Sequence, residues 1–205
     1  MLDFDCCSQR HRMRITTLAA LGIGAWGLYR ATQHVGLPAG VTPVQGFSLR
    51  RYLGLWYEVA RIDHRYERGL TDTTARYTLR PDGRVQVLNR GYDPRSGRWR
   101  QAIASAEPVA AADVAHLQVC FFWPIRASYA VCALDASYEH ALVSGPSHDD
   151  LWLLARNPNI KATTRATLLE QAREAGFDTG RLLWVDQRHN LAALSDGLPR
   201  HKPMR

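Results

Sequence analysis

Short stretches of alternating apolar and polar residues, separated by turn residues, form the main pattern of the chain after residue 56. The clearest period of two lies in Thr73–Arg80, where Ala75, Tyr77 and Leu79 alternate with polar or charged side chains. Such alternation is typical of a β-strand with one buried face. Further strands are expected at Tyr57–Asp63, Val85–Tyr92, Arg98–Ala106, His116–Phe122, Ser128–Asp135, His140–Ser144 and Asp150–Ala155. Eight strands with mostly short connections predict a mainly β fold, an antiparallel up-and-down barrel, because closure removes the exposed strand edges.

Two stretches outside the strands are expected to be helical. Phe47–Leu53 is a short helical approach to the first strand, and Gly54 lets the backbone leave it in a tight turn. Lys161–Ala175 is a longer helix that ends at Gly176 with Phe177 packed behind it, which is typical of a Schellman stop. The apolar face of this helix would hold Leu168, Leu169, Ala172 and Ala175.

The N-terminal region has the form of an export signal. A basic stretch, Arg10–Arg14, precedes the apolar stretch Ile15–Tyr29. As a helix, that apolar stretch would span about 22 Å, less than the roughly 30 Å of a bilayer core, so a full transmembrane helix is disfavoured. A cleaved signal, a retained marginal anchor and a buried N-terminal helix stay open, as does a start at Met13.

The predicted domain boundaries follow from these patterns. They are residues 1–30 for a signal peptide or membrane anchor, 31–43 for a linker, 44–187 for the barrel domain and 188–205 for a disordered basic tail. A last short strand is expected at Leu182–Val185. The formal charge is +7, but residues 41–187 carry 18 basic and 16 acidic side chains, so the domain is nearly neutral. Without a basic stripe, nucleic acid is not an expected partner.

Catalytic and metal-binding patterns are weak. The cysteines form no Cys-x-x-Cys pair and no Cys/His ligand spacing, so neither a metal nor a cofactor is expected. Ser147, His148 and Asp149 are adjacent in a turn, where they cannot adopt the geometry of a catalytic triad. We therefore expect a binding protein rather than an enzyme.

Three motifs occur in a defined order along the predicted strands. Gly54-x-Trp56 opens the first strand, Asp135 with Tyr138 lies between the sixth and seventh, and Arg156 follows the eighth. With these motifs the chain resembles the lipocalin family, specifically its bacterial outer-membrane branch and more distantly its apolipoprotein D-like members. The resemblance covers roughly residues 44–187.

The resemblance implies a calyx that is closed at one end. Arg156 would stack on the floor tryptophan, Trp56, and a desolvated cation–π contact of this kind contributes up to about 2 kcal/mol. A solvated charge is the alternative interpretation of Arg156. Gly54, Trp56, Asp135 and Arg156 are thus expected to be structural.

The resemblance also implies a function. Proteins of the bacterial branch resemble carriers of fatty acids and lysophospholipids, which implies binding, storage or transport of such lipids for maintenance of the cell envelope, in the periplasm or outer membrane. That branch carries a lipid-modified cysteine after its export signal, whereas here no cysteine follows the apolar segment before Cys120. The N-terminal segment itself would therefore contact the membrane, or the protein is released into the periplasm.

If Trp56 closes one end of the barrel, the loops at the other end form the mouth. We expect loops 64–70, 93–97, 123–127 and 145–149 there. The rim candidates for binding a ligand head group are Arg65, Arg68, Trp123 and Arg126. An ordinary solvated rim is the alternative, because Asp149 and Asp150 nearly cancel the basic excess.

The cavity candidates are Glu58, Tyr77, Asn89, Trp99, Phe122 and Tyr129. Ordinary barrel packing is the alternative for each of them, because these strands carry apolar residues on both faces. Glu58, if it points inward, would need a partner or an elevated pKa. Other ligands such as a tetrapyrrole, a lipocalin-related enzyme, a purely structural envelope protein and a homodimer remain alternatives.

The two cysteines of the domain are expected to lie on neighbouring strands. A turn at Trp123–Ala127 that pairs Phe122 with Tyr129 or Ala130 would place Cys120 opposite or nearly opposite Cys132. Facing strand residues have Cβ atoms about 4.5–5.5 Å apart, which is longer than the roughly 3.5–4.5 Å of a disulfide. A partly formed disulfide and two packed thiols both stay open.

Overall fold

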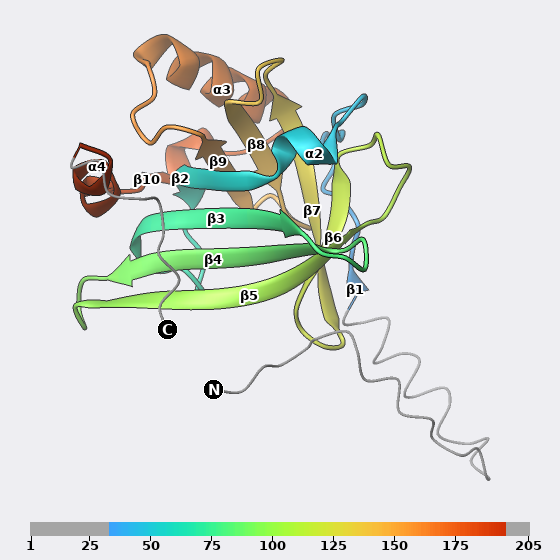
Figure 1. Cartoon of the computed structure of the whole chain (residues 1–205). Coiled ribbons are helices and arrows are strands. Elements are labelled where there is room, and N and C mark those ends of the chain that lie inside the picture. Colours follow the sequence, from blue (N-terminus) through green and yellow to red (C-terminus); the bar gives the residue numbers. More distant parts are fainter. Residues whose placement is uncertain (1–32, 196–205) are drawn as a thin grey trace, which may run out of the picture.

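The computed structural model describes residues 33–195 and shows a closed antiparallel barrel (Figure 1). Its strands follow one another around the ring in the order β7-β6-β5-β4-β3-β2-β9-β8, and β8 pairs back with β7. The ring consists of β2 Gly54–Ile62, β3 Thr71–Leu79, β4 Val85–Asp93, β5 Arg98–Pro108, β6 His116–Phe122, β7 Ile125–Leu134, β8 His140–Ser144 and β9 Leu151–Ala155. The eight-stranded barrel that the alternating pattern predicted is confirmed.

Two short strands cover backbone edges that the ring leaves unpaired. β1 (Gln33–His34) runs parallel to β7 at Arg126–Ala127, beyond the reach of the short strand β8. β10 (Leu182–Trp184) pairs with β2 at Ala60–Ile62, where β3 no longer does. Both additions satisfy strand groups that would otherwise be open to pairing with another chain. β1 lies in a stretch that was expected to be only a linker.

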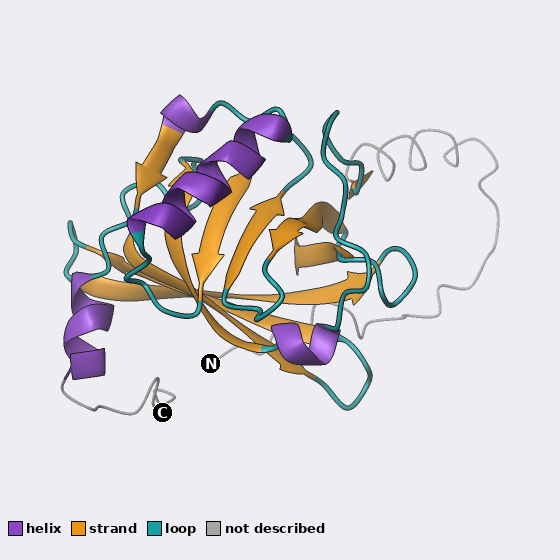
Figure 2. Cartoon of the chain, turned by 90° about the horizontal axis from the view of Figure 1, so that it is seen from above, coloured by secondary structure: helices purple, strands orange, loops and turns teal. Residues whose placement is uncertain are grey.

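The barrel has one apolar core inside and another outside. The inner core is built on the floor, where α2 (Leu49–Tyr52) brings Tyr52 beneath the first strand. The outer core lies between the barrel wall and α3 (Ala162–Glu174), which crosses the outside of the strands (Figure 2). Leu168 and Ala172 are the buried residues of α3.

The end of α3 follows the predicted Schellman geometry. Gly176 has φ +88°, in the left-handed region where a side chain would be strained. Its N–H donates to Arg173 O, and the N–H of Phe177 donates to Ala172 O at 3.0 Å. These two hydrogen bonds satisfy carbonyls of the last turn and let Phe177 pack into the outer core.

The segment after Gln187 corrects the prediction of a disordered tail. Helix α4 occupies Arg188–Ser195, after the turn η1 (Thr179–Arg181) and β10. The buried carboxylate of Asp72, on β3, accepts hydrogen bonds from the backbone N–H groups of His189 and Asn190. A strand residue therefore supplies the cap that the helix start needs. Residues 196–205 lie outside the described part of the chain.

The predicted pairing of the two cysteines is wrong. The turn between β6 and β7 contains only Trp123 and Pro124, so Val119 faces Ala127 and the residue across from Cys120 lies near Arg126. Cys132 lies about 20 Å further along β7, at the strand rise of about 3.3 Å per residue. The two thiols form no disulfide, and Cys132 donates instead to Leu142 O.

The predictions for residues 1–30 fall outside the described residues. From residue 33 to residue 195, the helices are all too short or too polar to cross a membrane.

Candidate functional site

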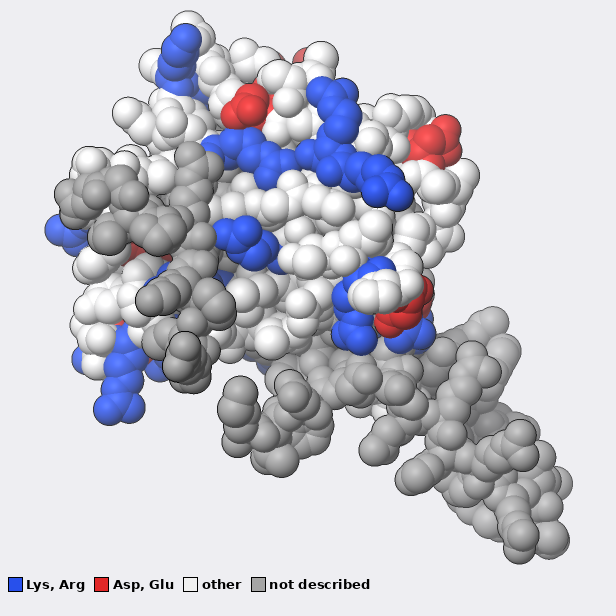
Figure 3. Space-filling model, viewed as in Figure 1, with Lys and Arg blue, Asp and Glu red and all other residues white. Residues whose placement is uncertain are grey.

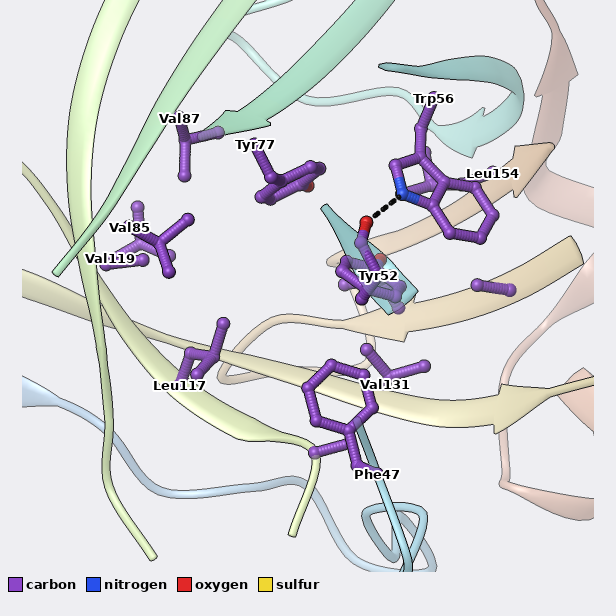
Figure 4. Close-up of a cluster of buried hydrophobic side chains, with 14 of the residues drawn as sticks. Phe47, Tyr52, Trp56, Tyr77, Val85, Val87, Leu117, Val119, Val131 and Leu154 are labelled. Carbon is purple, nitrogen blue, oxygen red and sulfur yellow. Dashed lines mark hydrogen bonds between the residues drawn. The ribbon is translucent and has the colours of Figure 1, made fainter. Parts of the chain in front are cut away.

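The floor of the barrel is a stacked arginine–tryptophan pair. Trp56 is completely buried, and the Arg156 guanidinium carbon lies 3.9 Å from the centre of its ring. The Trp56 indole donates to Tyr52 O at 2.8 Å (Figure 4). Arg156 donates to Leu55 O at 2.8 Å and to carbonyls of α2 and its flanks. The predicted stack is confirmed, and it ties the closing helix to the end of β9.

Gly54 is required by this arrangement. Its φ is +99°, and a Cβ atom there would lie 3.3 Å from Arg156 Nη1. Asp135 is also structural, because its carboxylate accepts hydrogen bonds from the N–H groups of Glu139 and His140 and so closes the β7–β8 turn.

Three tyrosine hydroxyls meet just above the floor. Tyr129 Oη lies 2.7 Å from both Tyr52 Oη and Tyr77 Oη. Burial raises the pKa of all three phenols above the ordinary value, so they stay neutral hydrogen-bonding groups. Figure 4 shows Tyr52 and Tyr77 on one side of the interior and the side chains of Val85, Val87 and Val119 on the other. The lower interior is therefore apolar with one polar point.

The solvent exposure of the inward-facing side chains in one layer of the barrel increases from β2 to β5. Trp56 pairs with Ala75, Ala75 with Asn89 and Asn89 with Ala102, so these four side chains share the inner face. Trp56 is buried, Ala75 and Asn89 are half-buried, and Ala102 is exposed. β5 pairs with β6 only from Ser105 onward, so the inner face keeps accessible surface at Asn89 and Ala102, and this accessible inner face is called the hollow below. This hollow is the candidate ligand site.

A buried charged cluster lies on the opposite wall, towards the mouth. Arg61 is completely buried and donates to the Glu58 carboxyl group at 2.8 Å. It also donates to the carbonyls of Glu67 and Leu70, and thereby holds loop 63–70 against the barrel. The Glu67 carboxylate accepts from the Trp152 indole at 3.0 Å and pairs with His64 at 2.9 Å.

The cluster holds two carboxylates around one guanidinium. Burial, together with the charge of Glu67, raises the pKa of Glu58 to about 8 although Arg61 lowers it. Burial would also raise the pKa of Glu67, but hydrogen bonds and charge from His64, Trp152 and Arg61 lower it below its ordinary value. The extra proton therefore resides on Glu58, and Glu67 stays ionised next to His64 and Trp152. Glu58 does point inward, as predicted, and has both the partner and the elevated pKa that burial demands.

Of the predicted cavity residues, Tyr77, Asn89 and Tyr129 face the interior along with Glu58. Trp99 does not. It pairs with Tyr92 on the outer face of the barrel, where the Arg90 guanidinium lies 3.7 Å from the centre of its ring. Phe122 is 76% exposed at the tip of the β6–β7 hairpin, beyond the hollow. Both residues belong to strands with apolar side chains on both faces, where alternation cannot assign a direction.

The predicted rim is only partly correct. Arg65, Arg68 and Trp123 lie in mouth loops, and Arg68 pairs with Asp63 at 3.5 Å. Arg126 lies on the outer wall, because its neighbour Ala127 faces Val119 of the inner core, and it forms an ion pair with Glu107 at 2.7 Å. Arg126 is therefore not a rim residue.

Sequence reasoning missed Arg61, Glu67 and Tyr52. A charged residue inside a strand of otherwise apolar neighbours, as in Val59-Ala60-Arg61-Ile62, was the available signal for Arg61. Glu67 and Tyr52 lie in a loop and a short helix, where no period indicates direction.

A second hollow lies outside the barrel, between α3 and the β7–β8 turn. It has a volume of about 280 Å³ and is lined by Leu134, Asp135, His140, Thr164, Thr167, Leu168 and Gln171. Over residues 33–195, histidine, cysteine and acidic side chains do not gather into a group that could hold a metal ion.

Comparisons with known proteins agree with this geometry. A family model described as a lipocalin-like domain matches residues 47–187. The chain is 45% identical over 175 residues to outer membrane lipoprotein Blc of Escherichia coli K12, an alignment that covers 85% of this chain and 98% of that protein. It is 30% identical to mouse apolipoprotein D, over 85% of this chain and 94% of that protein. Among solved structures, the cockroach allergen Per a 4 superposes with a TM-score of 0.60 at 17% identity, over 74% of this chain and 95% of that one.

Proposed function

This chain belongs to the lipocalin family, whose members are generally binding and transport proteins for small hydrophobic ligands, and we propose that it carries a single-chain amphiphile in its barrel. The amphiphile is a fatty acid or a lysophospholipid. Its alkyl chain occupies the hollow, and its head group stays at the mouth. Two close relatives, from Escherichia coli and Vibrio cholerae, are named outer membrane lipoproteins, which supports a location in the cell envelope.

The observation that supports this proposal is the accessible inner face at Asn89 and Ala102. Below it, the interior is closed by aromatic rings and valine side chains, which suit a hydrocarbon chain. An eight-stranded barrel is just wide enough for one small ligand. A single alkyl chain fits such a space better than the two chains of an ordinary phospholipid.

The buried phenolic and charged groups inside the barrel are already paired, which also favours an alkyl chain. The tyrosine hydroxyls bind one another, and Arg61 is satisfied by Glu58, Glu67 and Leu70. A buried anionic head group would find no open cationic partner in the described interior. The head group is therefore placed at the mouth, where water and exposed arginines are available.

Two adjacent residues of β5 provide a matched test. Ala102→Trp fills the hollow from the inner face, whereas Ile103→Trp adds the same side chain on the outer face, where Ile103 is 59% exposed. We expect Ala102→Trp to weaken binding of oleic acid and of lysophosphatidylethanolamine at least tenfold, and Ile103→Trp to change it less than twofold. Calorimetric titration measures both, and thermal unfolding checks that both variants fold. Equal affinity of the two folded variants would contradict the proposed site.

A further inference from the structure

The tip of the β6–β7 hairpin exposes a group of large apolar side chains. Phe122 is 76% exposed, Trp123 is 68% exposed and Ile125 is 52% exposed. Phe121, one residue before, is 37% exposed. Single exposed apolar residues are common on proteins, but four within five consecutive positions indicate a surface that meets an apolar partner.

Strand pairing explains why this tip stands apart from the barrel wall. β5 pairs with β6 only as far as Ser105 and Cys120, so Phe121 and Phe122 lie beyond the last paired residue. Phe122 and Ile125 pair with each other across the two-residue turn, which keeps the tip narrow. In Figure 1 this turn, drawn in olive yellow, projects at the end of the barrel opposite α2. The apolar tip therefore projects at the open end of the barrel.

The other loops at this end add positive charge. Arg65, Arg95 and Arg98 lie in or beside mouth loops, and within residues 33–195 they form no ion pair with a carboxylate. The carboxylates of this end are mostly engaged: Asp63 pairs with Arg68, Asp93 with Arg100 and Asp149 with Arg181. Asp150 is the exception, and its carboxylate accepts a hydrogen bond from Ser147. Arginines at the same end of the barrel as an apolar tip complement an anionic lipid surface.

Tyr66 extends the same chemistry to loop 63–70. Its ring is 74% exposed, and the Arg65 guanidinium lies 4.7 Å from the ring centre while donating to its hydroxyl. Aromatic side chains next to arginine favour the level of lipid head groups, where a ring can meet acyl chains and a charge can meet phosphate.

We propose that the hairpin tip, Phe121–Ile125, inserts into the surface of an anionic phospholipid bilayer and holds the barrel mouth against it. The occupant of this surface is a lipid bilayer rather than a protein, because the apolar tip is small and the arginines of the other mouth loops match phosphate. The purpose of docking rests on the proposed function: an amphiphile would pass between the bilayer and the hollow without crossing water. The docking itself does not depend on which ligand the barrel takes.

The test uses the full chain and vesicles of phosphatidylcholine with about a third of phosphatidylglycerol. Brominated acyl chains quench tryptophan fluorescence at short range, so the difference between the parent protein and Trp123→Phe reports the depth of Trp123. A double variant, Phe122→Ser with Ile125→Ser, removes the apolar tip. Ile103→Ser is the matched control, because Ile103 is exposed on the outer wall and away from the tip.

We expect Trp123 to be quenched on anionic vesicles, and less so in high salt or without phosphatidylglycerol. The double variant is expected to bind vesicles about a hundredfold more weakly, because each apolar side chain removed from lipid contributes on the order of tenfold. Ile103→Ser is expected to change binding less than twofold, because Ile103 lies away from the tip. If the N-terminal segment holds every variant on the vesicles, the binding measurements do not distinguish the variants, and quenching of Trp123 alone shows whether the tip inserts.

Two results would overturn the proposal. One is vesicle-bound protein whose Trp123 is not quenched. The other is burial of Trp123 that depends on protein concentration without lipid, which would assign the tip to a second copy of this chain. Fatty-acid binding measured without vesicles separates this test from the proposed function. If the parent protein does not bind fatty acid, the carrier function is refuted and the docking result still stands.

Discussion

Replacement of Arg156 is expected to loosen the floor of the barrel. Arg156→Ala removes the ring contact at 3.9 Å from Trp56 and the donors to Leu53 O and Leu55 O. A hydrogen bond from a charged group contributes about 1.5–3 kcal/mol, but these carbonyls lie close to solvent and recover part of that from water. With up to about 2 kcal/mol for the cation–π contact, the expected loss in free energy of unfolding is about 3–4 kcal/mol.

A double-mutant cycle isolates the stacking from the other effects. Trp56→Leu keeps apolar volume under the floor but removes the aromatic face, and it is expected to cost about 2–4 kcal/mol. Because both changes remove the same contact, their combined loss should fall short of the sum by about 1–2 kcal/mol. Urea unfolding followed by circular dichroism gives all four free energies. Additivity within about 0.5 kcal/mol would refute the pairing.

The outer wall offers a control for this cycle. Arg165, on the exposed face of α3, also stacks on a tryptophan, with its guanidinium carbon 3.3 Å from the centre of the Trp184 ring. Solvent screens this contact, so the coupling of Arg165→Ala with Trp184→Leu is expected to stay below about 1 kcal/mol. A coupling as large as that of the floor would show that burial does not strengthen the stack.

Further predictions concern pH, the last helix and the cysteines. The pKa of Glu58 is about 8 in the folded protein, above its ordinary value, so the folded state binds the extra proton and the free energy of unfolding should fall as pH rises from 5 to 8. Glu58→Gln should flatten that slope, and an unchanged slope in urea titrations would contradict the assignment. Asp72→Ala removes the cap of α4 and should speed hydrogen exchange at Arg188–Ser195 without unfolding the barrel. Unchanged exchange there would show that Asp72 does not hold the helix. Cys120 and Cys132 should both be alkylated in denatured protein without reductant, and failure of both to react would indicate a disulfide between them. In the folded protein Cys132 should react slowly, because burial raises its pKa to about 11.

The fold could be predicted where a local pattern determines it. Thr73–Arg80 has one apolar and one polar face, and the resemblance of Gly54, Trp56 and Arg156 to the lipocalin motifs implied the closed floor. The end of α3 at Gly176 follows from backbone freedom alone. For these elements, residue type and spacing carry the necessary information.

Other features depend on contacts between distant segments. The register of β6 against β7 depends on a turn of two residues, Trp123 and Pro124, where five were expected, and so Cys132 moved away from Cys120. Helix α4 forms where a disordered tail was predicted, because its cap comes from Asp72 on β3. Neither fact can be read from the neighbouring residues.

The candidate site shows the same division. Tyr77 points inward as its alternation predicts, whereas Trp99 lies outside on a strand whose two faces are both apolar or mixed. The pairing of Arg61 with Glu58 follows from a bulge in β2 between Glu58 and Ala60, which turns both side chains to the interior. A bulge changes direction without leaving a signature in the alternation.

Because the central claim is a single-chain amphiphile in the hollow beside Ala102, native mass spectrometry of the protein purified from its own cell envelope tests it most directly. We predict a bound mass that matches one fatty acid or one lysophospholipid, retained by Ile103→Trp and absent from folded Ala102→Trp. A parent protein that carries no ligand, a chromophore in its place, or an equal ligand content in both variants would contradict the account.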